Sequence, residues 1–209
     1  MIGGRVLQLC LERPDVDRVT VLVRKPSGVA HPKLMELVHS DLLELSPVAE
    51  RMAGQDVCFF CLGVYTGAVP PDEFRKITVD YTRSFATLLR EKSPTAAFCF
   101  LSGEGADRTE KSGMMFARDK GAAENLLVAL QFARLHVFRP GYIYPSQPRV
   151  EPNWTYSLMR VLYKPVMSKV YPNGGVTSDE LADAMVRVGF GGGAELLTNR
   201  EIRGVVKAI

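Results

Sequence analysis

The feature that most constrains the fold is a regular alternation of short apolar strands with helical patterns. Strand-like runs rich in β-branched and aromatic residues lie at residues 19–24, 34–39, 56–62, 96–101 and 135–139. Helical patterns lie at residues 2–12, 43–52, 71–92 and 114–130. Such alternation is typical of a parallel sheet with helices on both faces. We therefore predict a doubly wound α/β fold, and the 209 residues suffice for one domain over residues 1–209.

The N-terminal helix departs from the pattern of a nucleotide-binding βαβ unit. In such a unit a strand and a glycine-rich turn precede the first helix. Here the sequence begins about where the last glycine of that turn would lie, at Gly3. We expect the fold to lack its first strand and most of the turn, which leaves a central position of the sheet empty. The hypothesis is that the natural protein has about ten further residues upstream; a genuinely shortened chain is the alternative.

The C-terminal third is less regular. Residues 140–152 have a loop-like composition, and residues 156–170 are apolar enough for a helix that breaks at Pro165. The tetrapeptide Thr177-Ser-Asp-Glu180 is a capping box that predicts a helix over residues 179–188. Residues 196–209 indicate a closing strand and a short tail. We expect the region from about 142 to 176 to line the substrate side.

Composition argues against several classes of function. The chain is 46% hydrophobic and 23% charged, and its net charge of +3 is too small to indicate nucleic acid as a partner. No apolar run approaches the ~20 residues of a membrane span. The N-terminus lacks a basic-then-apolar signal pattern, so a cytoplasmic protein is expected. Unpaired strand edges make a homo-oligomer possible.

Cysteine and histidine do not indicate a metal or redox site. Cys58 and Cys61 match C-x-x-C, but they lie in a predicted strand, where residues three apart point to opposite faces. Buried free thiols are the better interpretation. The three histidines are His31, His39 and His136, which are far apart in the sequence, and we predict no metal site.

Two neighbouring segments carry the candidate chemistry. Residues 98–107 predict a buried strand that delivers Ser102 at its C-terminal end, and residues 116–124 begin a helix that carries Lys120. Other motifs follow in a fixed order: Val21-Leu-Val-Arg24, Asp41-Leu42, Cys61-Leu-Gly63 and Phe138-Arg-Pro-Gly-Tyr-Ile-Tyr144. In order and spacing the chain resembles the atypical or extended short-chain dehydrogenases/reductases, which have a Rossmann-like fold. It is similar in particular to the Tat-interacting-protein-like oxidoreductases.

The resemblance implies catalytic roles for three positions. In the family a lysine holds the nicotinamide ribose and lowers the pKa of a tyrosine, a serine steadies the substrate oxygen, and the tyrosine exchanges the proton. Ser102 and Lys120 match the serine and the lysine, but the tyrosine position is Phe116, which has no proton to exchange. Thr78 stands where the superfamily usually has asparagine. Tyr65 and Tyr142, on loops that leave strand ends, are the nearest replacements for the missing acid.

The resemblance also implies a nicotinamide cofactor, NADP with NAD possible. The candidate binding residues are Gly3, Arg24, Lys25, Asp41, Leu42, Leu62, Gly63, Lys120, Pro140, Gly141, Tyr142 and Ile143. Arg24 and Lys25 resemble the basic pair that binds a 2′-phosphate, because no acid for an NAD ribose ends that strand; two solvated charges are the alternative. Gly3 could equally be a helix cap, and Asp41 a strand-end residue that serves as a helix cap. Residues 140–143 resemble the loop that contacts the carboxamide, or form a plain strand-to-loop turn.

Two functions from different classes remain open. One is an NADP-dependent oxidoreductase that acts on a small carbonyl or sugar-like substrate. The other is a non-catalytic protein that senses NADP(H) or scaffolds a partner. In both cases the expected ligand is a small molecule or a nucleotide. The non-catalytic protein is favoured by Phe116, Thr78 and the expected absence of the first strand. The oxidoreductase is favoured by Ser102, Lys120 and the Pro140-Gly141 pair.

Overall fold

The fold is α/β, and all of its described strand pairs are parallel. The computed structural model describes residues 1–146 and 174–208. The strands are β1 (Val19–Val23), β2 (Leu34–Val38), β3 (Val57–Phe60), β4 (Ala97–Leu101), β5 (Arg134–Arg139), β6 (Tyr142–Tyr144), β7 (Gly175–Thr177) and β8 (Leu196–Thr198). The helices are α1 (Ile2–Glu12), η1 (Ser46–Met52), α2 (Pro71–Arg75), η2 (Lys76–Asp80), α3 (Tyr81–Lys92), α4 (Met115–Ala129), α7 (Ser178–Gly191) and α8 (Asn199–Lys207). The predicted parallel α/β fold is confirmed.

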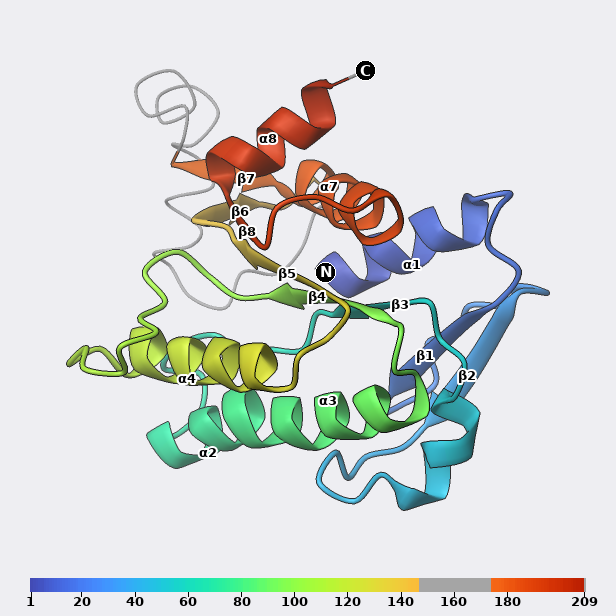
Figure 1. Cartoon of the computed structure of the whole chain (residues 1–209), viewed down its shortest axis with the longest axis horizontal. Helices are drawn as coiled ribbons and strands as arrows, with labels where there is room; N and C mark the ends of the chain where they lie inside the picture. The colour runs from blue at the N-terminus through green and yellow to red at the C-terminus, as the bar shows by residue number, and fades with distance from the viewer. Residues whose placement is uncertain (147–173, 209) are drawn as a thin grey trace.

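The strands form three sheets. The central one has the order β3-β4-β5-β8, β1 pairs with β2, and β6 pairs with β7. Figure 1 shows α1, α7 and α8 on one side of the central sheet and α3 and α4 on the other. The β1–β2 pair lies beside this sheet and is joined to it by no ladder among the described residues.

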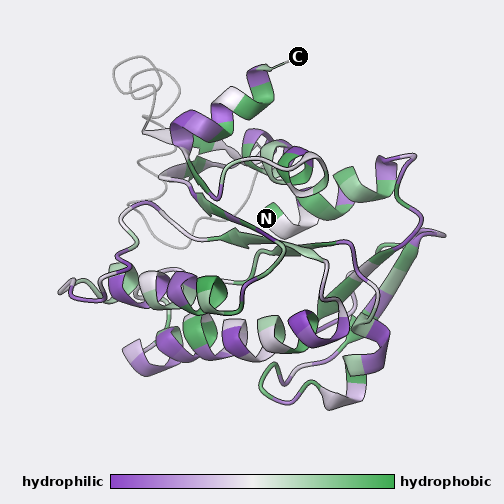
Figure 2. Cartoon of the chain, in the orientation of Figure 1, coloured by the Kyte–Doolittle hydropathy of each residue, from purple (hydrophilic) through white to green (hydrophobic). Residues whose placement is uncertain are grey.

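Alternation along the central strands fills two cores, one on each face. In β4, Phe98 and Phe100 pack against Leu89 of α3 and Leu127 of α4, whereas Cys99 faces the other core. That second core is formed by α1, α7, β8 and α8, and its fully buried members include Leu181, Met185, Leu197 and Ile202. Figure 2 shows the corresponding apolar colour on the inner sides of the helices. A strand buried on both faces explains the continuous apolar run of β4.

A third cluster attaches the β1–β2 pair to the rest. Leu37, Leu42, Leu45, Val48 and Met52 form it, and Leu22, Tyr81, Phe85 and Leu88 pack against it. Among the described residues, the β1–β2 pair is therefore held to the rest of the protein by hydrophobic side-chain packing, and strand pairing does not join it to the central sheet.

The long helix predicted over residues 71–92 contains a π-helical turn. The turn, η2, inserts an extra residue between α2 and α3. The buried face consequently passes through Phe74, Thr78, Thr82, Ala86 and Leu89. A regular helix over residues 71–92 would instead place Ile77, Tyr81, Phe85 and Leu88 in one apolar stripe with Phe74, but these four side chains are only half-buried.

The C-terminal prediction needs two corrections. The short strand β8 is present, but residues 199–207 form helix α8 instead of a tail. Thr198 and Glu201 form its capping box, a Thr-x-x-Glu signal that the sequence prediction overlooked. Tyr142–Tyr144 also forms a strand, β6, where a loop was expected. The helix predicted over residues 156–170 lies outside the described residues.

The capping box at Thr177 is confirmed. Its side chain accepts a hydrogen bond from the Glu180 backbone at 3.1 Å, and the Glu180 carboxylate accepts one from the Thr177 backbone at 2.7 Å. Cys58 and Cys61 are free thiols that pack in different cores, as predicted, but only Cys58 is buried, since Cys61 is half-buried just after the end of β3. Burial raises the pKa of Cys61 to about 12, which suppresses its reactive thiolate.

Within residues 1–146 and 174–208, no helix is both long and apolar enough to cross a membrane.

Candidate functional site

The candidate site begins where β4 and β5 end. These strands are parallel neighbours, so the loops that follow them emerge at the same edge of the sheet. The Ser102 backbone N–H donates to Phe138 O at 2.8 Å, and the Glu104 N–H donates to Pro140 O at 2.8 Å. The structure therefore brings Ser102 and the 140–143 loop together, although 38 positions separate Ser102 from Pro140 in the sequence.

Ser102 donates its hydroxyl proton to a buried carboxylate. Its Oγ lies 2.5 Å from Glu124 Oε1, and both side chains are buried. A serine hydroxyl has one proton and two lone pairs. With the proton committed to Glu124, Ser102 has only acceptor capacity left for another group.

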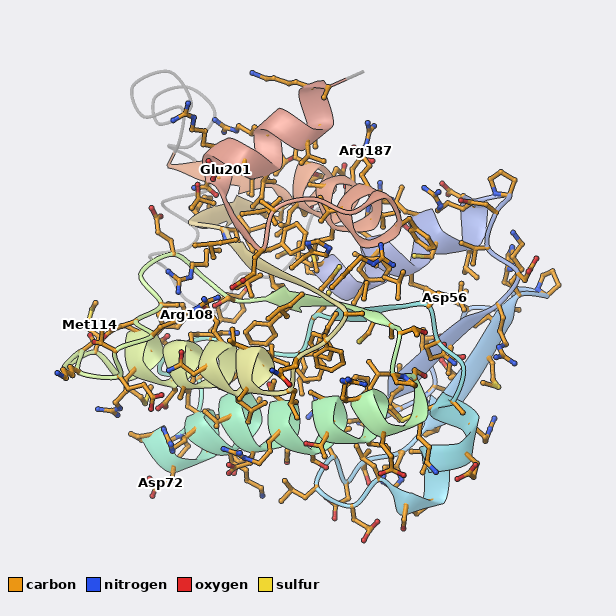
Figure 3. The ribbon with its side chains drawn as sticks, in the orientation of Figure 1. Asp56, Asp72, Arg108, Met114, Arg187 and Glu201 are labelled. Atoms are coloured by element: carbon orange, nitrogen blue, oxygen red, sulfur yellow. The ribbon has the colours of Figure 1, made fainter. Side chains whose placement is uncertain are left out.

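Two arginines hold the same carboxylate. Arg139 donates to both Glu124 oxygens, at 2.9 Å from Nε and 2.5 Å from its terminal nitrogen. Arg108 Nε donates at 2.7 Å and reaches Glu195 with a terminal nitrogen at 3.0 Å. Figure 3 shows Arg108 above α4. The cluster is thus a buried, fully hydrogen-bonded carboxylate between two guanidinium groups.

The charge state of Glu124 follows from these bonds. Burial alone would raise the pKa of Glu124, but hydrogen bonds from Arg139, Ser102 and Arg108 outweigh it and hold the pKa below its ordinary value. Glu124 is therefore ionised near neutral pH and remains an acceptor for Ser102.

Lys120 lies one helical turn before Glu124 and is almost fully buried. Its Nζ donates to Leu101 O at 3.0 Å and lies 5.0 Å from the centre of the Phe100 ring. Burial lowers the pKa of Lys120 to about 8, although the Glu124 charge acts in the opposite direction. The ammonium therefore lies directly beside the strand end that delivers Ser102.

Phe116 occupies the position of the missing acid and contacts apolar and backbone groups. Its ring lies 6.4 Å from that of Phe74, centre to centre. A Cβ built on Gly103 would lie only 2.5 Å from Phe116 Cζ, so the tip of the ring faces the Gly103 backbone. Ser102 and Phe116 together offer no free proton donor at this edge.

Helix α4 lies so close to the loop of residues 105–108 that position 121 requires glycine. A Cβ on Gly121 would lie 1.8 Å from Asp107 O. The Asp107 backbone N–H donates to Ala117 O at 2.8 Å, which fixes the loop on the helix. This contact sets the position of Lys120 and Glu124 relative to Ser102.

The cofactor candidates near β1 and β3 are mostly exposed. Arg24 and Lys25 are exposed directly after β1. Gly63 is exposed after β3, and a Cβ on Gly3 would lie 3.4 Å from Cys61 Cβ, so the start of α1 adjoins the end of β3. These positions all follow strand ends or begin a helix, as a dinucleotide site requires.

Other candidates have structural partners. Asp41 Oδ1 accepts a hydrogen bond from the Leu43 backbone N–H at 2.9 Å. Asp41 therefore caps a turn rather than a helix, because the next helix, η1, begins at Ser46 after Leu45. Leu42 is buried in the cluster under β2, and Leu62 is half-buried against two clusters. In that position the Leu42 side chain packs in the core.

The 140–143 segment is held from the other side by α8. Pro140 is buried, and the Gly141 backbone N–H donates to Asn199 Oδ1 at 3.0 Å. Tyr142 and Ile143 belong to β6 and pair with Gly175 and Val176. The region from 142 to 176 is described only at its two ends.

Sequence reasoning gave no role to Glu124, Arg108, Arg139 or Asn199. The available signal for Glu124 was its spacing, since an acid four residues after Lys120 lies on the same helix face. The arginines come from a loop and from β5, and nothing in their local sequence indicates a shared partner. Thr78, the second departure from the family pattern, is buried in the π-helical turn.

Comparison with known proteins gives distant relatives and a shared fold. No family model matches the chain. HTATIP2 of Rattus norvegicus is 34% identical over 103 residues, which are 49% of this chain and 41% of that protein. The mitochondrial protein fmp52 of Aspergillus clavatus is 29% identical over 149 residues, 68% of this chain and 62% of that protein. The chain thus spans about half the length of these curated relatives.

Solved structures extend the similarity to nearly the whole chain. A short-chain dehydrogenase from Burkholderia cenocepacia, in complex with NADP, superposes with a TM-score of 0.62 over 99% of this chain and 88% of that chain, at 16% identity. WbmH of Bordetella bronchiseptica, in complex with NAD+, gives 0.66 over 99% and 77%, also at 16% identity. At such identities these matches show the fold.

Proposed function

We propose that this chain, which is a distant relative of the HTATIP2 and FMP52 proteins and has a Rossmann-like fold, is a nicotinamide dinucleotide-binding protein that binds its cofactor without efficient carbonyl reduction. One observation carries the proposal: neither Ser102 nor Phe116 can donate a proton at the edge where the substrate oxygen would lie. General acid catalysis is typically worth about 10²–10⁴-fold in rate. Its loss leaves binding as the function that the site supports best.

The residues present fit a dinucleotide in part. Arg24 and Lys25 are exposed at the end of β1, where they would hold a 2′-phosphate and favour NADP over NAD. Gly3 and Gly63 are exposed and have no side chain, so a cofactor could approach their backbone. Lys120 and the 140–143 loop would hold the nicotinamide end. When bound, the cofactor would supply hydride chemistry.

The expected affinity is low. Among the described residues, α1 carries Gly3 and Gly4 at its start but no glycine-rich turn leads into it from a strand, so we expect this chain to bind with Kd values above the low-micromolar range, weaker than roughly −8 kcal/mol.

An oxidoreductase is the second candidate, and one observation favours it. The lowered pKa of Lys120, about 8, would allow this buried amine to exchange a proton near neutral pH. Its substrate would be a small carbonyl or sugar-like compound. A cytoplasmic location and a homo-oligomer stay predictions, and FMP52 relatives are described as mitochondrial.

Two measurements on the same sample test the proposal. NADPH fluorescence gives a binding isotherm, and NADPH absorbance follows oxidation against a panel of aldehydes and ketones. We expect saturable binding with no turnover above background. Turnover at ordinary enzyme rates, about 1–10³ per second, would establish the oxidoreductase instead. Absence of binding at millimolar NADPH would contradict both candidates.

A further inference from the structure

Glu104 is an exposed acid in the tight turn that follows β4. A hydrogen bond from the Ala106 backbone N–H to Gly103 O, 3.2 Å long, closes this turn. Gly105 has a φ of +84°, the conformation that a type II turn requires at its third residue and that glycine adopts without strain. Glu104 therefore occupies the second position of a defined turn, at the sheet edge where open α/β folds bind ligands.

This turn is held against the 140–143 loop. The Glu104 backbone N–H donates to Pro140 O at 2.8 Å, so the acid is bonded to the loop through its main chain. A Cβ built on Gly141 would clash with Glu104 Oε2, so the carboxylate lies against the Gly141 Cα. The negative charge of Glu104 is thus placed on the segment to which the proposed function assigns the nicotinamide end.

Within the part of the chain that the structure describes, the Glu104 carboxylate has no hydrogen-bond or ion-pair partner. The basic groups at this sheet edge are used elsewhere. Arg108 and Arg139 bind the buried carboxylate of α4, and Lys120 Nζ donates to the carbonyl at the end of β4. Glu104 therefore offers an uncompensated negative charge to a ligand, whereas Lys120 contributes a positive charge of opposite effect.

The two redox forms of a nicotinamide cofactor differ in the charge of the ring. The oxidised ring is a cation and the reduced ring is neutral, while the adenosine, ribose and phosphate groups are the same in both forms. A carboxylate beside the ring consequently attracts the oxidised form and has little effect on the reduced one. Because Glu104 is exposed, water screens this attraction and the effect is modest.

We propose that Glu104 is a specificity-determining residue that shifts the binding preference of this chain toward the oxidised nicotinamide cofactor. The inference rests on the proposed function, because it requires the nicotinamide end to lie at the 140–143 loop. It adds the redox state of the ligand to that function. A protein that binds both forms without turnover, and binds them unequally, responds to the ratio of oxidised to reduced cofactor.

The test compares Kd for NADP+ and NADPH, both measured by isothermal titration calorimetry on the full chain at neutral pH. We expect Glu104→Gln to lower the ratio of the NADPH Kd to the NADP+ Kd about fivefold, the effect of two unit charges a few Å apart in water. Glu104→Lys reverses the charge, so we expect a change of about 25-fold in the same direction. The Lys120 charge is present in every variant and does not alter the comparison.

Two controls locate the effect. Glu110→Gln removes an equal charge from the same loop, where Glu110 accepts a hydrogen bond from Asn125, and should leave the ratio within about twofold. Adenosine 2′,5′-bisphosphate lacks the nicotinamide, so its Kd should agree within about twofold between the wild type and Glu104→Gln.

Three results would overturn the proposal: equal changes for NADP+ and NADPH, a ratio that Glu104→Lys does not alter, or a change of the same size with Glu110→Gln or with the bisphosphate. In each of these cases the wild type still binds the dinucleotides, so the proposed function would stand while the role of Glu104 would not. Absence of wild-type binding to both NADP+ and NADPH at millimolar concentration would contradict the proposed function itself, and this inference with it.

Discussion

A serine hydroxyl carries a single proton. Ser102 donates it in a hydrogen bond to the Glu124 carboxylate, which also accepts hydrogen bonds from two guanidinium groups. Glu124 is fully buried, so its charge is compensated only by its neighbours. A carboxylate of this kind stabilises the fold only while its partners remain. The same bond that orders the site therefore takes away the donor function of Ser102.

Glu124→Gln should be strongly destabilising, because it leaves Arg139 and Arg108 without their shared negative charge. We expect a loss of about 3–5 kcal/mol in the free energy of unfolding, measured by urea denaturation. Glu195→Gln is the matched control, because it removes the other carboxylate that pairs with Arg108. The Glu195 side chain is 55% exposed, so its loss should cost about 0–1 kcal/mol. Equal losses for the two variants would show that the buried cluster contributes no more than a surface pair.

The pKa of Lys120, about 8, makes stability depend on pH in a defined direction. An unfolded lysine titrates near 10.5, so between about pH 8 and 10.5 the unfolded state binds a proton that the folded state has lost. Stability therefore contains a term that rises with pH over this window. We expect the unfolding free energy of the wild type minus that of Lys120→Met to grow by up to about 3 kcal/mol.

This difference is measured by urea denaturation at several pH values from 7 to 10.5. Other titrating groups are common to both proteins and cancel in the subtraction. A difference that stays flat would mean that Lys120 keeps an ordinary pKa in the folded protein, and one that falls with pH would mean that its pKa is raised.

Phe116→Tyr tests the lost acid directly. A tyrosine there would supply a phenolic proton beside Lys120, and we expect NADPH-dependent carbonyl reduction to rise by about 10²-fold or more above the parent. The ring must move slightly, because Cζ already faces the Gly103 backbone. Phe116→Leu is the control for packing, and it should show no gain. If the parent already turns over at ordinary rates, Tyr65 and Tyr142 become the first residues to replace.

At the scale of elements, helix α4 is the part that positions the site. It carries Phe116, Lys120 and Glu124 on one face, and it contacts the 105–108 loop most closely at Gly121. A helix can approach a backbone carbonyl this closely only where it has no side chain. Gly121 is therefore a packing requirement of the site and not a weakness of the helix.

Gly121→Ala should destabilise the protein by about 1–3 kcal/mol or more, because the new methyl group meets Asp107 O. Gly204→Ala is the matched control in α8, where no neighbour lies within 4 Å of the added Cβ. It should stabilise by about 0.5–1 kcal/mol, since alanine favours the helix. Thermal unfolding of both variants measures the contrast, and the same sign for both would contradict it.

Elements with strong local signals were predictable from sequence. The β-branched run of β1, the aromatic run of β4 and the capping box at Thr177 each follow from a few adjacent residues. The π-helical turn at η2 was not, because it changes the phase of a helix without changing its composition. Strand β6 depends on its pairing with β7, more than 30 residues away, which no local pattern indicates.

The site was predictable in its parts and not in its connections. The resemblance to the short-chain dehydrogenases/reductases predicted that Ser102, Phe116 and Lys120 lie together, and the structure has them at one sheet edge. The bond between Ser102 and Glu124 joins a strand end to a helix 22 residues later, and its strength depends on Arg108 and Arg139 from two other segments. Only the fold brings these four together.

At the scale of the whole molecule, the candidate cofactor residues are divided between two sheets. Arg24 and Lys25 follow β1 of the two-stranded sheet, whereas Ser102 and Lys120 lie at the end of the four-stranded one. Among the described strands no ladder joins the two sheets, and the cluster around Leu37 provides the packing between them. A dinucleotide that reached from Arg24 to Lys120 would therefore bind both units and should stabilise the protein as it saturates.

The Arg24→Ala/Lys25→Ala double variant tests whether the end of β1 selects the nucleotide. A 2′-phosphate adds about two negative charges that only NADPH carries, and charge-assisted bonds to it are stronger than neutral ones. We expect Kd for NADPH to rise about tenfold or more while Kd for NADH stays within about twofold, as measured by cofactor fluorescence. Arg200→Ala/Lys207→Ala is the matched control, because it removes the same charge from exposed positions on α8 and should affect neither nucleotide. A parallel loss for NADPH and NADH would place the basic pair on a part that both share, such as the pyrophosphate, and the proposed preference for NADP would then be wrong.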